Sequence, residues 1–240
     1  MGPFFDDDVS QCEPAIKKRA HREAILSQYP NWRPIIPKDP PLDVSQLIIS
    51  RLTPEEHRIV HLDATALVER IAAHQLTAVQ VFLAFAKTAV AAQDLTNCLS
   101  EIFIEEGLVR AKELDAHLAA TGKVVGPLHG LPVSIKDHIL VKGYDTSSGY
   151  VAWAGKTVAD RDAVFVDILR KSGAVLYVKT ANPQTLLVSL SLGNGGPRII
   201  MMHFDHDHSP WRRRITYMAA LYTHSIDVFP LEAALEARER

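Results

Sequence analysis

The fold of this chain is decided by the stretch Gly126-Pro127-Leu128-His129-Gly130-Leu131-Pro132-Val133-Ser134-Ile135-Lys136-Asp137. Two turn glycines precede a short apolar strand, 133–135, and a lysine follows it directly. Side chains alternate along a strand, so Ser134 and Lys136 share one face of the sheet and the apolar residues share the other. If helices cover both faces of the sheet, Lys136 is buried.

A lysine in this position has two interpretations. Burial disfavours the charged ammonium, and the neutral amine that results can accept a proton from a serine hydroxyl, as in Ser/Lys chemistry. Alternatively, the head group of Lys136 reaches solvent from the end of the strand and has no chemical role. The residues alone leave both interpretations open.

Strands and helices alternate on both sides of this stretch. The run 102–104 is β-branched and aromatic and predicts a strand, and 105–118 has helical periodicity. Further on, Asp162 is the predicted N-cap of a helix that leads into a third strand over 174–178. This alternation predicts an α/β fold in which helices cover a sheet.

The N-terminal part carries helix signals around a proline-rich segment. An amphipathic helix is predicted over 14–28, and five prolines between residues 30 and 41 predict an extended arm on the surface. Thr53, Asp63 and Thr77 are each predicted to cap a helix. We expect the helices after Asp63 and Thr77 to form an outer layer.

Composition excludes several classes of function. The net charge of −2, from 26 basic and 28 acidic residues, gives no electrostatic footprint for nucleic acid or an anionic membrane. The two cysteines, Cys12 and Cys98, are too few for a disulfide framework or a zinc site of several thiolates. No signal peptide or membrane span is visible. These observations predict a soluble, cytoplasmic protein without a cofactor or a metal, whose partner is a small molecule.

The stretch 126–137 resembles the amidase-signature family, whose members carry G-P-L-x-G-(V/I/L)-P-(V/I)-(S/A)-(I/V/L)-K-(D/E), and it agrees at every position. The similarity continues over 141–150 and 173–184. The runs Leu52-Thr53-Pro54-Glu55-Glu56 and Leu95-Thr96-Asn97-Cys98-Leu99 look like the acetamidase-like general amidases of fungi. The resemblance covers about residues 12–189.

The resemblance implies a large mixed sheet surrounded by helices, of which this chain carries the N-terminal part. It also implies hydrolysis of a small-molecule amide by a Ser-cisSer-Lys triad, in which Lys136 matches the lysine that acts as general base. Backbone N–H groups of a glycine-rich loop would hold the oxyanion. No nucleic acid, membrane or cofactor is implied.

The family's two catalytic serines lie in P-G-G-S-S-G-G and G-T-D-I-G-G-S segments that should follow 182–184, and this sequence carries neither. Ser191 has no flanking glycine loop. The change of composition near Leu190 is attributed to a changed reading frame or a retained intron. We therefore expect an N-terminal helix and arm over 1–61, a partial amidase domain over 62–189, and a disordered or weakly helical tail over 190–240.

Three interpretations of function follow. The favoured one is an amidase by descent whose polypeptide is inactive because both serines are missing. The second is a non-catalytic binding or regulatory module that pairs with a full-length amidase or with itself through exposed sheet edges. The third is a small active hydrolase that combines Lys136 with Ser134, Ser147 or Ser148.

The tail offers two further candidates. His203, His206 and His208 could gather a metal, but their dense spacing fits no familiar site and is typical of a solvated loop. The run 212–214 of three arginines could contact phosphate, but the nearly neutral charge of the whole chain favours a surface loop.

Overall fold

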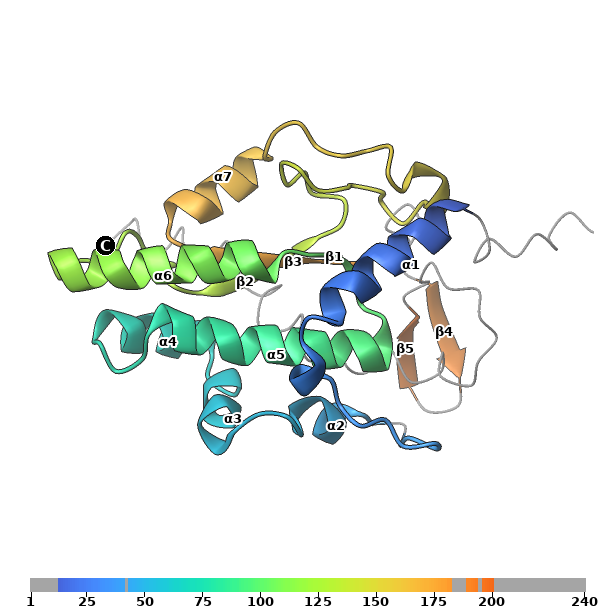
Figure 1. Ribbon diagram of the computed structural model, residues 1–240, viewed down its shortest axis with the longest axis horizontal. Helices are drawn as coiled ribbons and strands as arrows, with labels where there is room; N and C mark the ends of the chain where they lie inside the picture. The colour runs from blue at the N-terminus through green and yellow to red at the C-terminus, as the bar shows by residue number, and fades with distance from the viewer. Residues whose placement is uncertain (1–12, 42, 183–188, 194–195, 201–240) are drawn as a thin grey trace, which may run out of the picture.

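The computed structural model describes residues 13–41, 43–182, 189–193 and 196–200 (Figure 1). The elements in chain order are α1 (Glu13–Leu26), the 3-10 turn η2 (Pro30–Trp32), α2 (Ser45–Ile49), α3 (Pro54–Val60), α4 (Ala64–Ala72), α5 (Ala78–Thr96), β1 (Leu99–Ile102), α6 (Ile104–Thr121), β2 (Pro132–Lys136), the 3-10 turn η3 (Val151–Trp153), α7 (Val164–Lys171), β3 (Val175–Thr180), β4 (Ser189–Gly193) and β5 (Gly196–Ile200).

The predicted α/β fold with a mixed sheet is confirmed. The main sheet has the strand order β1-β3-β2, in which β3 runs antiparallel to β1 and parallel to β2. Val133 pairs with Leu176, and Lys136 pairs with Thr180. The parallel pair requires a crossover, and α7 supplies its helix.

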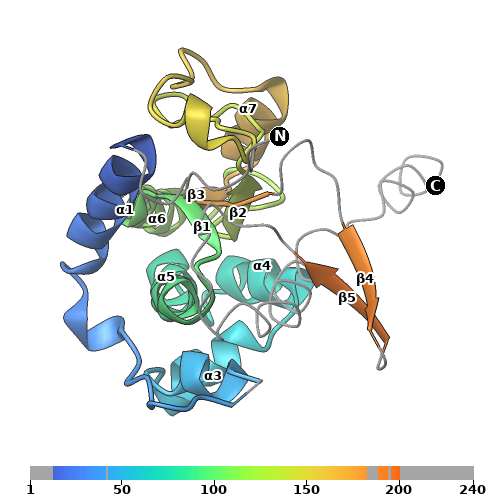
Figure 2. The ribbon, with the colours of Figure 1, turned by 90° about the vertical axis from the view of Figure 1, so that its right-hand side faces the viewer.

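The sheet lies between two layers, as Figures 1 and 2 both show. Helices α4 and α5 cover one side, and α7 with the segment that precedes it covers the other. On the far side of α5, Val44 and Ile48 pack against Ala91. Seven side chains of α5 are therefore completely buried: Ala78, Val81, Phe82, Ala84, Ala86, Val90 and Ala91.

The burial of α5 corrects the expectation that it belongs to an outer layer. Its N-terminal half packs on the sheet, where Phe82 meets Tyr177 edge to face with ring centroids 5.9 Å apart. Helices α2 and α3 cover its opposite side. A helix that is apolar on every side is the kind that lies inside a core, and the pattern from Val81 to Ala92 has that character.

Three of the four predicted helix caps are confirmed. Thr53 and Thr77 each form a capping box with the residue three positions later, and the Asp63 carboxylate accepts from the Ala66 N–H at 2.8 Å. The fourth is wrong, because Ala163 is the N-cap of α7. Asp162 instead accepts from the Lys142 N–H at 2.6 Å and from Arg170 Nε at 2.9 Å, so its carboxylate ties the preceding loop to the helix.

Two strand predictions need correction. The strand expected at 102–104 occupies Leu99–Ile102, and Ile104 already begins α6, because the Phe103 N–H makes the last bond to β3, at the Tyr177 carbonyl. No strand was predicted after Leu190, yet β4 and β5 pair antiparallel with Gly193 opposite Gly196. The intervening dipeptide, Asn194-Gly195, is the strongest short hairpin signal.

The N-terminal segments attach to the rest through charged side chains. Arg33, within the predicted arm, donates to Asp94 of α5 at 2.7 Å and to Glu23 of α1 at 2.5 Å. The arm thus follows the surface as expected, with the turn η2 in it. The proposed division of the chain at residues 61 and 189 stays a prediction. In the ranges described above, no helix has both the length and the apolar character needed to cross a membrane.

Candidate active site at the carboxyl end of strand β2

Lys136 is the last residue of β2, at the edge where the two parallel strands end. The Asp137 N–H donates to the Thr180 carbonyl at 2.8 Å, which fixes the chain just beyond Lys136 against β3. In open α/β sheets, ligands bind outside the carboxyl ends of the strands. The main chain therefore places the Lys136 amine where an active site of such a sheet is usually found.

Lys136 is only half-buried, as is Ser134 on the same face, whereas Ile135 on the opposite face is 1% exposed. Full burial of Lys136, which the sequence allowed if helices covered both faces of the sheet, is therefore not found in the described part of the chain. The condition behind it, that both faces of β2 are covered, is not met there. Lys136 retains a route to solvent and to any ligand.

Ser147 is held beside the site but not by Lys136. It is 3% exposed, and its hydroxyl donates to Asp137 Oδ2 at 3.1 Å. Asp137 is itself 1% exposed and directly follows the lysine. Ser148 lies in the turn after Ser147 with a φ of 52°. The hydroxyl of Ser147 therefore orients the segment that follows Lys136, and its proton is directed at a carboxylate.

The fully buried lysine of this chain is Lys179 on β3, with no exposed surface. Its Nζ donates to the Asp145 carbonyl at 2.6 Å and to Thr146 Oγ1 at 3.0 Å. Burial lowers the pKa of Lys179, against the opposing influence of the carboxylates of Asp137, Glu101 and Asp145. Sequence reasoning missed it, although a lysine inside the continuous apolar run of a buried parallel strand was the available signal.

Lys179 belongs to a buried charge cluster, which we define as Lys18, Glu101, Asp137, Asp145 and Lys179. Lys18 of α1 contacts Glu101 and lies 3.2 Å from Asp145 Oδ2. Burial raises the pKa of Glu101, and the neighbouring Lys18 opposes that shift. The cluster joins the first helix, two strands and the loop beyond Lys136.

Asp145 is the most hydrogen-bonded member of the cluster. Its Oδ2 accepts from the Gly155 N–H at 2.5 Å, and its Oδ1 accepts from Thr157 Oγ1 at 2.7 Å. Burial alone would raise the pKa of Asp145, but these hydrogen bonds and the charge of Lys18 outweigh it, and the pKa is lowered. Asp145 is therefore an anion that fixes the shape of the loop.

Chemically, this arrangement places the amine of Lys136 at a strand end, beside the hydrogen-bonded buried charge cluster. A general base needs a nucleophile within hydrogen-bond reach, and Ser147 is directed elsewhere. Within the described ranges, no three metal-binding side chains gather in one place. The candidates His203, His206 and His208, and the arginines at 212–214, lie outside the described residues.

Comparison with known proteins confirms the resemblance. Residues 80–195 match the family described as Amidase. The acetamidase of Emericella nidulans is 49% identical over 143 residues, which are 60% of this chain and 26% of that protein. The acetamidase of Aspergillus oryzae is 45% identical over 143 residues, again 60% and 26%. The chain thus spans about a quarter of the length of these relatives.

The fold is also that of a solved amide hydrolase. A structure of a fatty acid amide hydrolase superposes with a TM-score of 0.65 at 38% identity, over 79% of this chain and 35% of that one. The same mixed sheet and covering helices therefore occur in both proteins.

Proposed function

Because part of this chain belongs to the amidase-signature family, we propose that Lys136 is the general base of an amide-hydrolysing site. The reaction is hydrolysis of a small-molecule carboxylic amide to a carboxylate and ammonia or an amine. The position of Lys136 supports this proposal: it ends β2 at the ligand-binding edge of the sheet, within a stretch that agrees with the family's motif at every residue.

In this reaction, the amine of Lys136 would take a proton that is passed from a nucleophilic serine through a bridging serine. The serine oxygen would then attack the amide carbonyl, the amine would leave, and water would hydrolyse the acyl-enzyme. Half-burial of Lys136 suits this role, because the amine can reach a hydroxyl supplied by another segment.

We further propose that the polypeptide with the printed sequence does not hydrolyse amides by itself. The residues after Asn182 contain neither the P-G-G-S-S-G-G loop nor the G-T-D-I-G-G-S stretch in which the two serines lie. The bond from Ser147 to Asp137 argues against a local replacement. Such a chain would carry the general base without the two serines. From the sequence we expect this chain in the cytoplasm.

Two measurements test these proposals. Ammonia release from acetamide by the purified chain at high concentration is expected to equal the uncatalysed rate. Residues 1–182 are then placed in the acetamidase of Emericella nidulans in exchange for its matching segment, and this chimera is expected to release ammonia.

In the chimera, Lys136→Met is expected to lower kcat by about 10²- to 10⁴-fold, the contribution of a general base. Lys142→Met, which alters an exposed lysine six residues away, serves as the matched control and should leave kcat unchanged. Full activity of the Lys136→Met chimera would refute the assignment of Lys136. Acetamide hydrolysis by the original chain, lost in Lys136→Met, would refute its inactivity.

A second candidate function is that of a non-catalytic module that pairs with a full-length amidase. The observation that favours it is the strand order, in which β2 has a strand partner on one side only within the described part of the chain. An open strand edge is a template for pairing with another chain. Sedimentation velocity of a mixture with a purified acetamidase distinguishes the two, because a module co-sediments and an inactive relative does not.

A further inference from the structure

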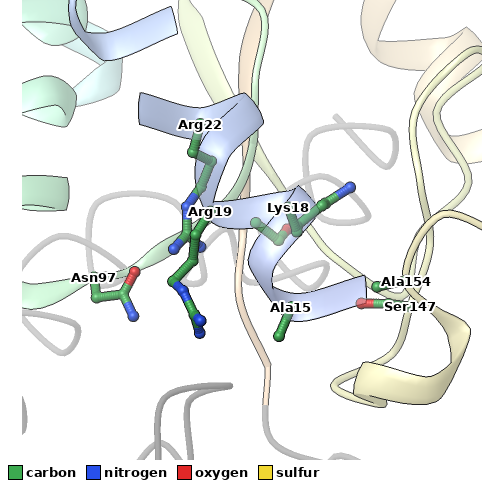
Figure 3. A pocket seen from close by; sticks show the side chains of 8 residues that line it. Ala15, Lys18, Arg19, Arg22, Asn97, Ser147 and Ala154 are labelled. Atoms are coloured by element: carbon green, nitrogen blue, oxygen red, sulfur yellow. The ribbon is translucent and has the colours of Figure 1, made fainter. Parts of the chain in front are cut away.

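The polar side chains around the small cavity beside α1 are already engaged with the protein itself. Arg22 donates to the Leu99 carbonyl at 3.0 Å, and Ser147 donates to Asp137 Oδ2 at 3.1 Å. Figure 3 shows that the ammonium of Lys18 points away from Arg22. By contrast, two imidazole rings on α3 keep ring nitrogens for a ligand.

These two rings belong to His57 and His61, one helical turn apart at the C-terminal end of α3. Their ring centroids are 4.3 Å apart, and the ring planes are inclined by 33°. Residues four positions apart lie on one face of a helix, so the backbone itself brings the two rings together. His57 is half-buried and His61 is exposed, so an ion in solution can reach the pair.

The hydrogen bond of the His61 ring determines which of its nitrogens carries the hydrogen. Nδ1 lies 2.8 Å from the His57 carbonyl oxygen, and a carbonyl oxygen can only accept. In the neutral ring, Nδ1 therefore carries the hydrogen and Nε2 carries the lone pair. The backbone N–H of His61 bonds to the Ile59 carbonyl, so the ring N–H serves as the donor to the His57 carbonyl at the end of the helix.

This arrangement of His61 is that of a histidine ready to bind a transition metal. A metal-binding histidine commonly donates its second ring N–H to a backbone carbonyl, which fixes the tautomer and the orientation of the ring. Two histidines at positions i and i+4 of a helix place two such rings on one face, where both can bind the same ion. In the part of the chain that the structure describes, no third metal-binding side chain joins them. Water or a group from another molecule would fill the other coordination positions.

We propose that His57 and His61 chelate a divalent transition-metal ion such as Zn²⁺, Cu²⁺ or Ni²⁺. Imidazole nitrogens suit these ions, whereas Mg²⁺ and Ca²⁺ prefer oxygen ligands. Zn–N bonds of about 2.0–2.1 Å place two nitrogens roughly 3.3 Å apart in a tetrahedral site. Two rings with centroids 4.3 Å apart reach this separation by rotation about their side-chain bonds.

The bound ion would stabilise the packing of α3 against α5. This packing already includes Ile59, which is 3% exposed, and the ion pair between Lys87 and Glu56 at 2.5 Å. Helix α3 lies on the side of α5 that faces away from the sheet (Figures 1 and 2), so the site is separate from Lys136. The proposal therefore does not depend on amide hydrolysis. An ion that binds the folded chain and not the unfolded chain raises the midpoint of thermal unfolding.

Binding is tested with zinc chloride on the ¹⁵N-labelled full chain near neutral pH, by long-range ¹H–¹⁵N correlation spectra of the imidazole rings. Saturable shifts of Nε2 of His61 and of a ring nitrogen of His57 are expected, while Nδ1 of His61 keeps its hydrogen. Each ring has its own resonances, so the histidines at 203, 206 and 208 are observed separately. Shifts confined to those three histidines, or no saturable shift at either ring of α3, would overturn the proposal.

Removal of either ring should abolish the chelate. His57→Gln is expected to raise the Kd of Zn²⁺ at His61 by about tenfold or more, because the second nitrogen of a chelate binds intramolecularly. His61→Gln should have the same effect at His57. His74→Gln is the matched control, since His74 is exposed at the end of α4 and has no histidine three or four positions away. This control should leave the Kd unchanged. An unchanged Kd in His57→Gln and His61→Gln, with circular dichroism spectra like that of the wild type, would refute the site.

Discussion

Replacement of Lys179 by methionine should destabilise this chain far more than the same change at Lys136. Lys179 is fully buried and donates two hydrogen bonds, at 2.6 and 3.0 Å, that no methionine can replace. Hydrogen bonds from a charged group contribute about 1.5–3 kcal/mol each, so the lower limit for the pair is about 3 kcal/mol. Removal of one partner from a buried ionic group costs a similar amount, about 3–5 kcal/mol.

The assay is equilibrium unfolding in urea, followed by circular dichroism. With an m value of about 2 kcal/mol/M, a loss of 3 kcal/mol lowers the midpoint by roughly 1.5 M. Lys136→Met and the exposed control Lys142→Met should each change the free energy of unfolding by less than about 1 kcal/mol. A loss below about 1 kcal/mol in Lys179→Met would refute the view that Lys179 compensates the buried carboxylates.

A second variant isolates the electrostatic part of this effect. Glu101 is 5% exposed and would lose a nearby cation in Lys179→Met. Glu101→Gln in the Lys179→Met background removes a buried charge, so it should recover part of the lost free energy. Strict additivity of the two changes would show that Glu101 and Lys179 do not interact.

Three further outcomes follow from the structure. The lowered pKa of Asp145 gives stability that is present above its ordinary value of 3.8 and is lost as the pH falls through the folded-state value. The difference in unfolding free energy between the wild type and Asp145→Asn should therefore shrink in urea titrations below pH 3.8, and a constant difference would contradict this. Gly107→Ala would place a Cβ 2.5 Å from Phe82 Cε2, so a loss of about 1–3 kcal/mol in unfolding free energy is expected in thermal unfolding. In Gly143→Ala the added Cβ would meet no atom within 4 Å, so this variant should lose only the free energy that its positive φ costs an alanine. Thr77→Ala removes the capping box of α5 and should cost about 1 kcal/mol, whereas Thr77→Ser should retain it.

The sequence predicted those features whose causes are local. Thr53, Asp63 and Thr77 cap helices because a side-chain oxygen needs only the N–H groups two or three residues later. Gly122 ends α6 with a φ of 65°, a conformation that glycine adopts without strain. Asp162 failed as a cap because distant partners, Lys142 and Arg170, compete for its carboxylate.

Features that depend on distant segments could not be predicted in this way. The apolar pattern of α5 over 81–92 is that of an interior helix, but it does not identify α2 and α3 as the helices that cover its far side. The half-burial of Lys136 and the complete burial of Lys179 depend on which face of each strand is covered. Lys136 lies at the end of a strand, as the sequence predicted, while the buried charge cluster became visible only in three dimensions.

The contact between Lys18 and Asp145 also constrains the order of events during synthesis. The two residues are 127 positions apart, and at translation rates of about 5–20 residues per second the second one emerges roughly 6–25 s after the first. The contact of α1 with Asp145 cannot form on the ribosome before that interval has passed. Before this contact forms, the many charged side chains of α1 keep the segment hydrated, because a segment rich in charge has little apolar surface to bury.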